Sequence, residues 1–117
     1  MANYRKLICW QKADNLSFLI YKLTSSFPKN EVFGITSQLR RASLSVPVNI
    51  VEGFNRNSKR ELSRFLNISL GSLAETEYLL YFSEKLGYIH DDPVELKNLI
   101  DEVGKLLWRF RESINKG

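Results

Sequence analysis

A cluster of basic side chains is the part of this sequence whose chemistry is easiest to interpret. Between Arg40 and Arg64 the chain carries six basic residues and two acidic ones. Guanidinium and ammonium groups bind phosphate oxygens through charge-assisted hydrogen bonds, so this stretch predicts a surface for RNA or DNA. The alternative is a basic face that only contacts solvent. The residues expected to contact phosphate are Arg40, Arg56, Lys59, Arg60 and Arg64.

The spacing of these residues favours an exposed cluster. Arg60 and Arg64 are four residues apart, which places them on one face of a helix, away from the apolar line through Leu62. Arg56 and Lys59 flank the start of that helix, where unpaired backbone N–H groups add positive potential. The cluster therefore combines side-chain charge with a helix N-terminus.

Catalytic and metal-binding groups do not form a recognisable arrangement in this sequence. His90 is the only histidine and precedes two aspartates; the trio could ligate a metal, but turn and helix-cap chemistry explains it better. Glu75 and Glu77 are two residues apart on a helix and so point in different directions. Glycine-rich phosphate loops, HExxH and CxxC motifs are absent. We expect no enzymatic activity, no cofactor and no bound metal.

Four other polar residues are expected to have structural roles: Arg41, Asn49, Glu52 and Glu75. Arg41 and Glu52 return to nearly the same side of a helix but lie about 16 Å apart along its axis, too far to pair directly. Each should meet a partner on another helix or subunit, with Glu75 the candidate for Arg41.

Composition limits the protein to one domain covering residues 1–117. The formal net charge is +4, and the single cysteine excludes an intramolecular disulfide. No apolar run approaches the length of a membrane span, which is about 18 residues or more. We therefore expect a cytoplasmic location without membrane contact.

Apolar residues recur at spacings of three and four in four segments, near residues 9–26, 31–52, 58–85 and from 92 onward. Connections are short, so we predict an all-α fold: an antiparallel up-down-up-down four-helix bundle. Pro47 lies inside the second segment and removes the amide that would bond to the Ser43 carbonyl. The proline predicts a kink, with a full break as the alternative.

Local signals predict how these helices begin, end and pack. Gly53 fits a left-handed residue just after the second helix. Ser58 and Glu61 form a capping-box pattern, and Asp92 with Pro93 and Glu95 repeats a helix-start pattern. The small pair Gly71-Ser72 predicts a close approach by a neighbouring helix.

Some apolar positions exceed what one bundle needs. Leu44, Val48 and Val51 form a second line about 140° around the second helix from the first. The third helix has extra apolar residues beside its inner stripe: Phe65, Ile68, Leu79 and Phe82, flanked by Tyr78 and Tyr81. These faces predict a homo-oligomer, whereas the alternative is a wide core with scattered exposed residues. The two tyrosines could stack bases, but subunit packing is the preferred role.

The chain resembles a family of small four-helix bundles, the 23S rRNA-intervening-sequence proteins. The segments that carry the resemblance are 27–31, 33–42, 45–53, Phe65-Leu66, Gly71-Ser72-Leu73-Ala74-Glu75 and Leu86-Gly87-Tyr88. Two departures are Val51, where alanine is more common, and Thr76, where leucine usually follows the glutamate. Family members are encoded within bacterial 23S rRNA genes or as free-standing genes.

The resemblance implies an assembly. A similar protein, the accessory variability determinant of diversity-generating retroelements, forms a five-subunit ring and works with a reverse transcriptase and its RNA. By resemblance, this chain would form a homopentamer with a basic surface open to nucleic acid. The family has no established catalytic activity.

The sequence therefore favours a non-enzymatic homo-oligomer that binds nucleic acid, RNA first, through phosphates. The alternative is a protein-interaction scaffold, such as a partner of a reverse transcriptase, with no direct nucleic-acid role. A metal-dependent enzyme is a third, weaker hypothesis. Salt separates the first two, because phosphate binding weakens steeply as salt rises and an apolar interface hardly changes.

Overall fold

The computed structural model describes residues 3–116, and four α-helices make up most of this range. They are α1 (Ile8–Thr24), α2 (Ile35–Phe54), α3 (Lys59–Lys85) and α4 (Val94–Lys116). Short 3-10 turns precede the first two helices: η1 (Tyr4–Lys6) and η2 (Lys29–Glu31). The described residues contain no β-strand. The predicted all-α four-helix architecture is confirmed, although α2 begins at Ile35 rather than near residue 31.

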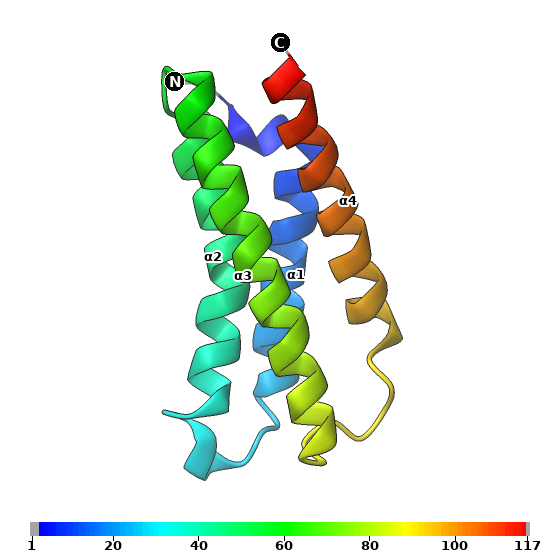
Figure 1. Cartoon of the computed structure of the whole chain (residues 1–117). Helices are drawn as coiled ribbons and strands as arrows, with labels where there is room; N and C mark the ends of the chain where they lie inside the picture. The colour runs from blue at the N-terminus through cyan, green and yellow to red at the C-terminus, as the bar shows by residue number, and fades with distance from the viewer. Residues whose placement is uncertain (1–2, 117) are drawn as a thin grey trace.

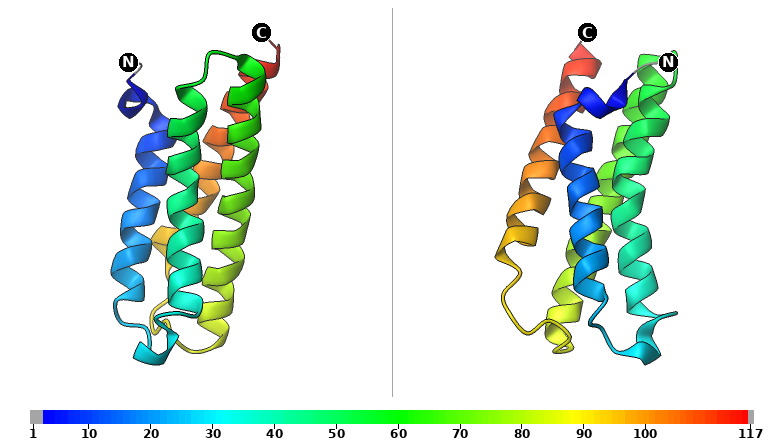
Figure 2. Two further views of the ribbon diagram at one scale, coloured as in Figure 1. Left: turned by 90° about the vertical axis from the view of Figure 1, so that its left-hand side faces the viewer. Right: turned by 180° about the vertical axis from the view of Figure 1, so that it is seen from behind.

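The helices lie side by side along one axis, and successive helices run in opposite directions (Figure 1). α1 and α3 each pack on α2 and α4, and α2 packs most extensively on α3. In the part of the chain that the structure describes, the diagonal pairs α1/α3 and α2/α4 do not approach closely. Figure 2 shows that η1, the α2–α3 turn and the end of α4 share one end of the bundle.

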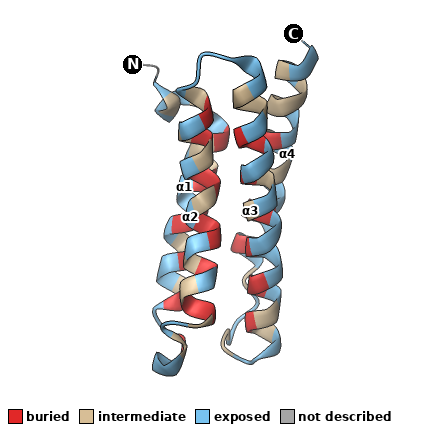
Figure 3. Ribbon diagram, turned by 60° about the vertical axis from the view of Figure 1, so that its left-hand side comes forward, coloured by how far each residue is buried: buried red, intermediate tan, exposed pale blue. Residues whose placement is uncertain are grey.

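The core consists of the predicted inner stripes. Buried residues gather where the helices face one another (Figure 3). Burying a leucine or isoleucine side chain stabilises the fold by about 1.5–3 kcal/mol. The largest fully buried aliphatic residues come from all four helices: Leu16, Ile20, Leu39, Val46, Ile50, Leu66, Leu80, Val103 and Leu107.

α2 continues through Pro47 without the full break that was the alternative prediction. The proline has no N–H to donate to the Ser43 carbonyl. The hydroxyl of Ser17 on α1 donates to that carbonyl instead, at 2.8 Å, and both serines are buried. A neighbouring helix therefore satisfies the carbonyl that Pro47 leaves unpaired. The kink itself stays a prediction.

The expectations for Gly53 and Gly71 are wrong. Gly53 lies within α2 and does not have the positive φ of a left-handed residue; a Cβ there would lie 2.8 Å from the Cβ of Phe65. Its role is to let α3 approach α2. Gly71 is exposed, and a Cβ there would meet nothing within 4 Å. Close packing in this region comes instead from Ser72, whose hydroxyl lies 2.7 Å from that of Ser45 on α2.

Two helix starts differ in detail from their predicted caps. Ser58 Oγ accepts a hydrogen bond from the Glu61 N–H at 3.0 Å, as a capping box requires. The Glu61 carboxylate does not return to Ser58 but binds Arg64. Near α4, the Asp92 carboxylate accepts from Lys97 Nζ at 2.9 Å. In both cases a nearby cation takes the carboxylate that the pattern assigned to the helix start.

Gly87 ends α3 in a Schellman motif. Its φ of 80° is in the left-handed region, which glycine adopts without steric cost. The Gly87 N–H donates to the Glu84 carbonyl at 2.9 Å, and the Tyr88 N–H donates to the Ser83 carbonyl at 3.0 Å. The turn directs the chain away from α3 toward α4.

Candidate nucleic-acid interface

The charged side chains are divided unequally along the bundle. The hydrogen bond between Ser45 and Ser72 and the approach of Leu73 to Gly104 mark a level near its middle. We call residues 3–16, 45–71 and 104–116 the basic half, and residues 17–44 and 72–103 the acidic half. The basic half has eleven Lys or Arg residues against four Asp or Glu, a net +7; the acidic half has six against nine, a net −3. The net charge of +4 is therefore distributed very unevenly along the bundle.

The four basic residues predicted around the start of α3 do come together in the basic half. Arg56, Lys59, Arg60 and Arg64 are all exposed, at the α2–α3 turn and on the first turns of α3. Within residues 3–116, Lys59 and Arg60 form no ion pair. Their charges are thus available to an anion.

The two other arginines of this cluster have acidic neighbours. Arg64 donates from Nε and Nη2 to the two oxygens of Glu61, at 3.1 and 3.3 Å, and this hydrogen bonding lowers the pKa of Glu61. Arg56 Nη2 donates to Glu52 at 3.4 Å. Exposed pairs of this kind contribute at most about 1 kcal/mol, so a phosphate can compete for either guanidinium.

Phe65 lies beneath both of these arginines. The guanidinium carbons of Arg56 and Arg64 are 5.0 and 4.4 Å from the centroid of its ring. The ring is buried, against Gly53, and so offers a fixed aromatic surface to two cations. Sequence reasoning placed Phe65 among the extra apolar residues and missed this role. Its position next to Arg64 was the available signal.

Arg40 does not join the cluster. Its Nε donates to the Thr24 hydroxyl at 2.7 Å, its Nη2 donates to the Tyr21 carbonyl at 3.2 Å, and its guanidinium lies over the Tyr21 ring at 4.7 Å. These contacts fix Arg40 to the end of α1, in the acidic half. Arg40 is therefore separate from the predicted phosphate contacts and has a structural role in this protein.

The expected polar ties have mixed outcomes. Asn49 Nδ2 donates to the carbonyl and hydroxyl of Ser45, at 2.8 and 2.9 Å, and Ser45 continues the network to α3. Glu52 pairs with Arg56 at the end of its own helix, not with another helix. No ion pair joins Arg41 to Glu75 among the described residues, and both are exposed. The expected Arg41–Glu75 contact is therefore not made within one chain, and a contact between subunits stays a prediction.

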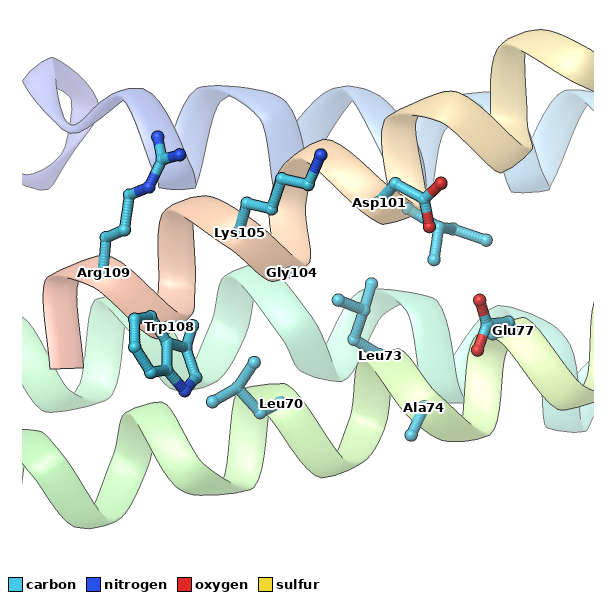
Figure 4. A pocket seen from close by; sticks show the side chains of 10 residues that line it. Leu70, Leu73, Ala74, Glu77, Asp101, Gly104, Lys105, Trp108 and Arg109 are labelled. Carbon is cyan, nitrogen blue, oxygen red and sulfur yellow. The ribbon is translucent and has the colours of Figure 1, made fainter. Parts of the chain in front are cut away.

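A groove of about 660 Å³ lies between α3 and α4, and sequence reasoning missed it. Trp108 points from α4 toward Leu70 of α3 (Figure 4). Lys105 and Arg109 also line the groove, but their side chains extend away from Trp108 in this view. Trp108 is 53% exposed. The available signal was a tryptophan outside the apolar stripe of the last helix, between basic residues.

The described residues form neither a metal-binding cluster nor a membrane-spanning helix. No group of three or more His, Cys, Asp or Glu side chains in residues 3–116 is placed to hold a metal ion. Over the same range, no helix combines the length and the apolar character that a membrane span requires.

The fold and this surface define a class: an all-α bundle of four helices whose basic residues concentrate at one end. The chain belongs to the 23S rRNA-intervening sequence protein family, which it matches over residues 5–109. The resemblance noted from its motifs is thereby confirmed.

A solved structure supports the same assignment. The chain is similar to a protein of unknown function from the S23 ribosomal protein family of Bacteroides thetaiotaomicron, with a TM-score of 0.82 and 26% sequence identity. The similarity covers 90% of this chain and 96% of the other. A comparison with curated protein sequences gives no match.

Proposed function

We propose that this protein is a non-enzymatic homo-oligomer that binds nucleic acid through its basic half. The observation that carries the proposal is the net charge of +7 in that half, with Lys59 and Arg60 unpaired among the described residues and two arginines held over Phe65. RNA is the first ligand to test, because the family name refers to 23S rRNA.

Phosphate contacts give this proposal a quantitative form. Each phosphate that a basic side chain neutralises releases counterions, so affinity falls as salt rises. Contacts from Arg56, Lys59, Arg60 and Arg64 to single-stranded RNA predict a slope of about −3 in log affinity against log salt concentration. A protein interface formed by apolar side chains would give a slope near zero.

Exposed apolar residues support the oligomeric part of the proposal. Phe18 of α1 is 62% exposed, and Leu44 and Val48 of α2 are 43% and 47% exposed. Such side chains on one outer face favour contact with another protein surface. A cyclic homo-oligomer, a pentamer by resemblance, would cover them, but a ring also needs a second, different face on each subunit. A reverse transcriptase is the alternative partner, in which case the protein is a scaffold.

The test is fluorescence anisotropy of a labelled structured RNA, titrated with protein at several salt concentrations. The test variant is Arg60→Glu with Arg64→Glu. The control is Lys29→Glu with Lys85→Glu, which changes the net charge equally but alters exposed residues of the acidic half. Each variant must keep the wild-type oligomer size in light scattering.

Binding that weakens with salt and is lost only in the Arg60/Arg64 variant supports the proposal. Equal losses in both variants would mean that total charge, and not the basic half, controls binding. Salt-insensitive or absent binding would favour the scaffold instead.

A further inference from the structure

Trp108 is the most prominent aromatic side chain of the basic half that the core does not use. It is 53% exposed and faces a groove of about 660 Å³. The groove wall on α3 is apolar near Trp108, with Leu70, Leu73 and Ala74 (Figure 4). An exposed indole ring above an apolar wall leaves space for a flat, partly apolar group.

The charges around the groove indicate which class of ligand would carry such a flat group. Lys105 and Arg109 lie three residues before and one residue after Trp108, and both are exposed. Glu77 and Asp101 line the other part of the groove, in the acidic half. The end of the groove at Trp108 is therefore flanked by cations on α4, whereas the other end is flanked by carboxylates. Proteins that bind single strands combine such cations with aromatic rings on which bases stack.

One face of α3 leads from the basic cluster toward the groove. Arg111 Nη1 donates to Asn67 Oδ1 at 2.9 Å, which joins α4 to α3 beside the groove; Arg111 also lies 3.8 Å from Glu112. Arg60 is seven residues before Asn67 and therefore lies on the same face of α3, about 10 Å along its axis. A phosphate backbone can follow this face from Arg60 to the groove.

We propose that the groove between α3 and α4 binds single-stranded RNA, with one base stacked on Trp108 and the neighbouring phosphates held by Lys105, Arg109 and the basic cluster. This inference rests on the proposed function and names its ligand class. A contact with another subunit that covers Trp108 instead is one outcome of the test below.

The other exposed aromatic residues all lie in the acidic half: Phe18, Tyr21, Phe33, Tyr78 and Tyr81. Tyr78 and Tyr81 are 58% and 55% exposed. Glu77 lies between them and Leu70 in sequence, and Glu84 lies beyond them on α3. Carboxylates disfavour a phosphate backbone nearby. Tyr81 is therefore a matched control for Trp108.

The experiment uses the Trp10→Phe variant, in which Trp108 is the remaining tryptophan of the two. Its fluorescence is followed during titration with a single-stranded oligoadenylate. Two probes serve as controls: an abasic oligomer of the same length, with the same phosphates but no bases, and an RNA duplex whose bases are paired. Stacking predicts strong quenching by the oligoadenylate alone.

Trp108→Ala should weaken oligoadenylate binding on the order of tenfold. Its affinity for the abasic oligomer and its salt slope should not change. Trp108→Phe keeps a ring and should restore part of the affinity, and Tyr81→Ala should bind as the wild type does. Oligomer size is measured for every variant.

Equal affinity for oligoadenylate and abasic oligomer, without quenching, would overturn the stacking site while leaving the proposed function standing. Absence of salt-dependent binding to all three probes would overturn both. A changed oligomer size in Trp108→Ala and Trp108→Phe would assign the groove to a subunit contact and overturn the stacking site.

Discussion

The hydrogen bond from Ser17 to the Ser43 carbonyl allows a direct test of how α2 accommodates Pro47. Replacing Ser17 with alanine removes the hydroxyl that lies 2.8 Å from this buried carbonyl. Because Pro47 has no N–H, the carbonyl then loses the partner that replaced its helical one. Alanine leaves no large cavity and is a good helix former. The hydroxyl's longer bond to the Ala13 carbonyl, at 3.2 Å, is also lost, but that carbonyl lies within α1 and belongs to its helical ladder.

The expected cost follows from the burial of both residues. An unsatisfied buried acceptor costs about 1–3 kcal/mol, and the better helix propensity of alanine returns a few tenths of a kcal/mol. Ser17→Ala should therefore destabilise the protein by about 1–2.5 kcal/mol. In a Pro47→Ala background the new amide can bond to Ser43, and the same substitution should cost less than about 1 kcal/mol.

The assay is chemical denaturation of the four proteins of this double-mutant cycle, at one protein concentration because an oligomer's stability depends on it. Ser83→Ala is the control: that hydroxyl is also buried, but its 2.8 Å bond goes to the Leu79 carbonyl within the same helix. Equal costs of Ser17→Ala in the wild-type and Pro47→Ala backgrounds would refute the reasoning, since distant sites add within about 0.5 kcal/mol.

Three further predictions concern packing, charge and reactivity. Gly53→Ala should destabilise the protein by about 1–2 kcal/mol in denaturation, because the new Cβ would lie 2.8 Å from a neighbouring side chain. Gly71→Ala should instead stabilise the protein by up to about 1 kcal/mol, because alanine has the higher helix propensity and its Cβ meets no other atom within 4 Å. Glu61→Gln should raise RNA affinity and steepen the salt slope in anisotropy titrations, because Arg64 loses its carboxylate partner. Burial raises the pKa of Cys9 from 9.0 to about 11, so its thiolate fraction at pH 8 is about a hundredfold below that of an ordinary thiol. Alkylation of Cys9 should accordingly be slow in the native protein and fast in denaturant.

Each of these predictions has a contrary result. Loss of stability in both glycine variants would mean that the bundle tolerates no alanine at either position. Unchanged binding in the glutamate variant would exclude Arg64 from the phosphate contacts. Rapid alkylation of the native protein would show that Cys9 reaches solvent.

The sequence predicts the helices well because each core stripe repeats within a single segment. Leu39, Val46 and Ile50 show their common face through spacing alone, and their burial follows. Glycines are harder to interpret. Gly53 has a packing role and Gly71 has none, and this difference depends on which residues another helix brings near. Such information is not contained in local spacing.

The candidate site also has a part that the sequence predicts and a part that depends on how the helices pack. Arg56 to Arg64 are close in sequence, so their grouping is predictable. Arg111 and Asn67 are 44 residues apart, and only the packing of α4 on α3 brings them to 2.9 Å. Glu61 is a third case, because its local pattern has a competitor. The capping box assigns its carboxylate to the Ser58 N–H, but the carboxylate binds Arg64 instead.

The division of charge along a bundle 45 Å long has a consequence for the kinetics of encounter. A molecule with +7 at one end and −3 at the other has a large electric dipole, which turns it in the field of an approaching polyanion before any contact forms. Collisions that would begin at the acidic end are converted into collisions at the basic end. Association should therefore be faster than a net charge of +4 suggests, and this acceleration should vanish as salt shortens the range of the field.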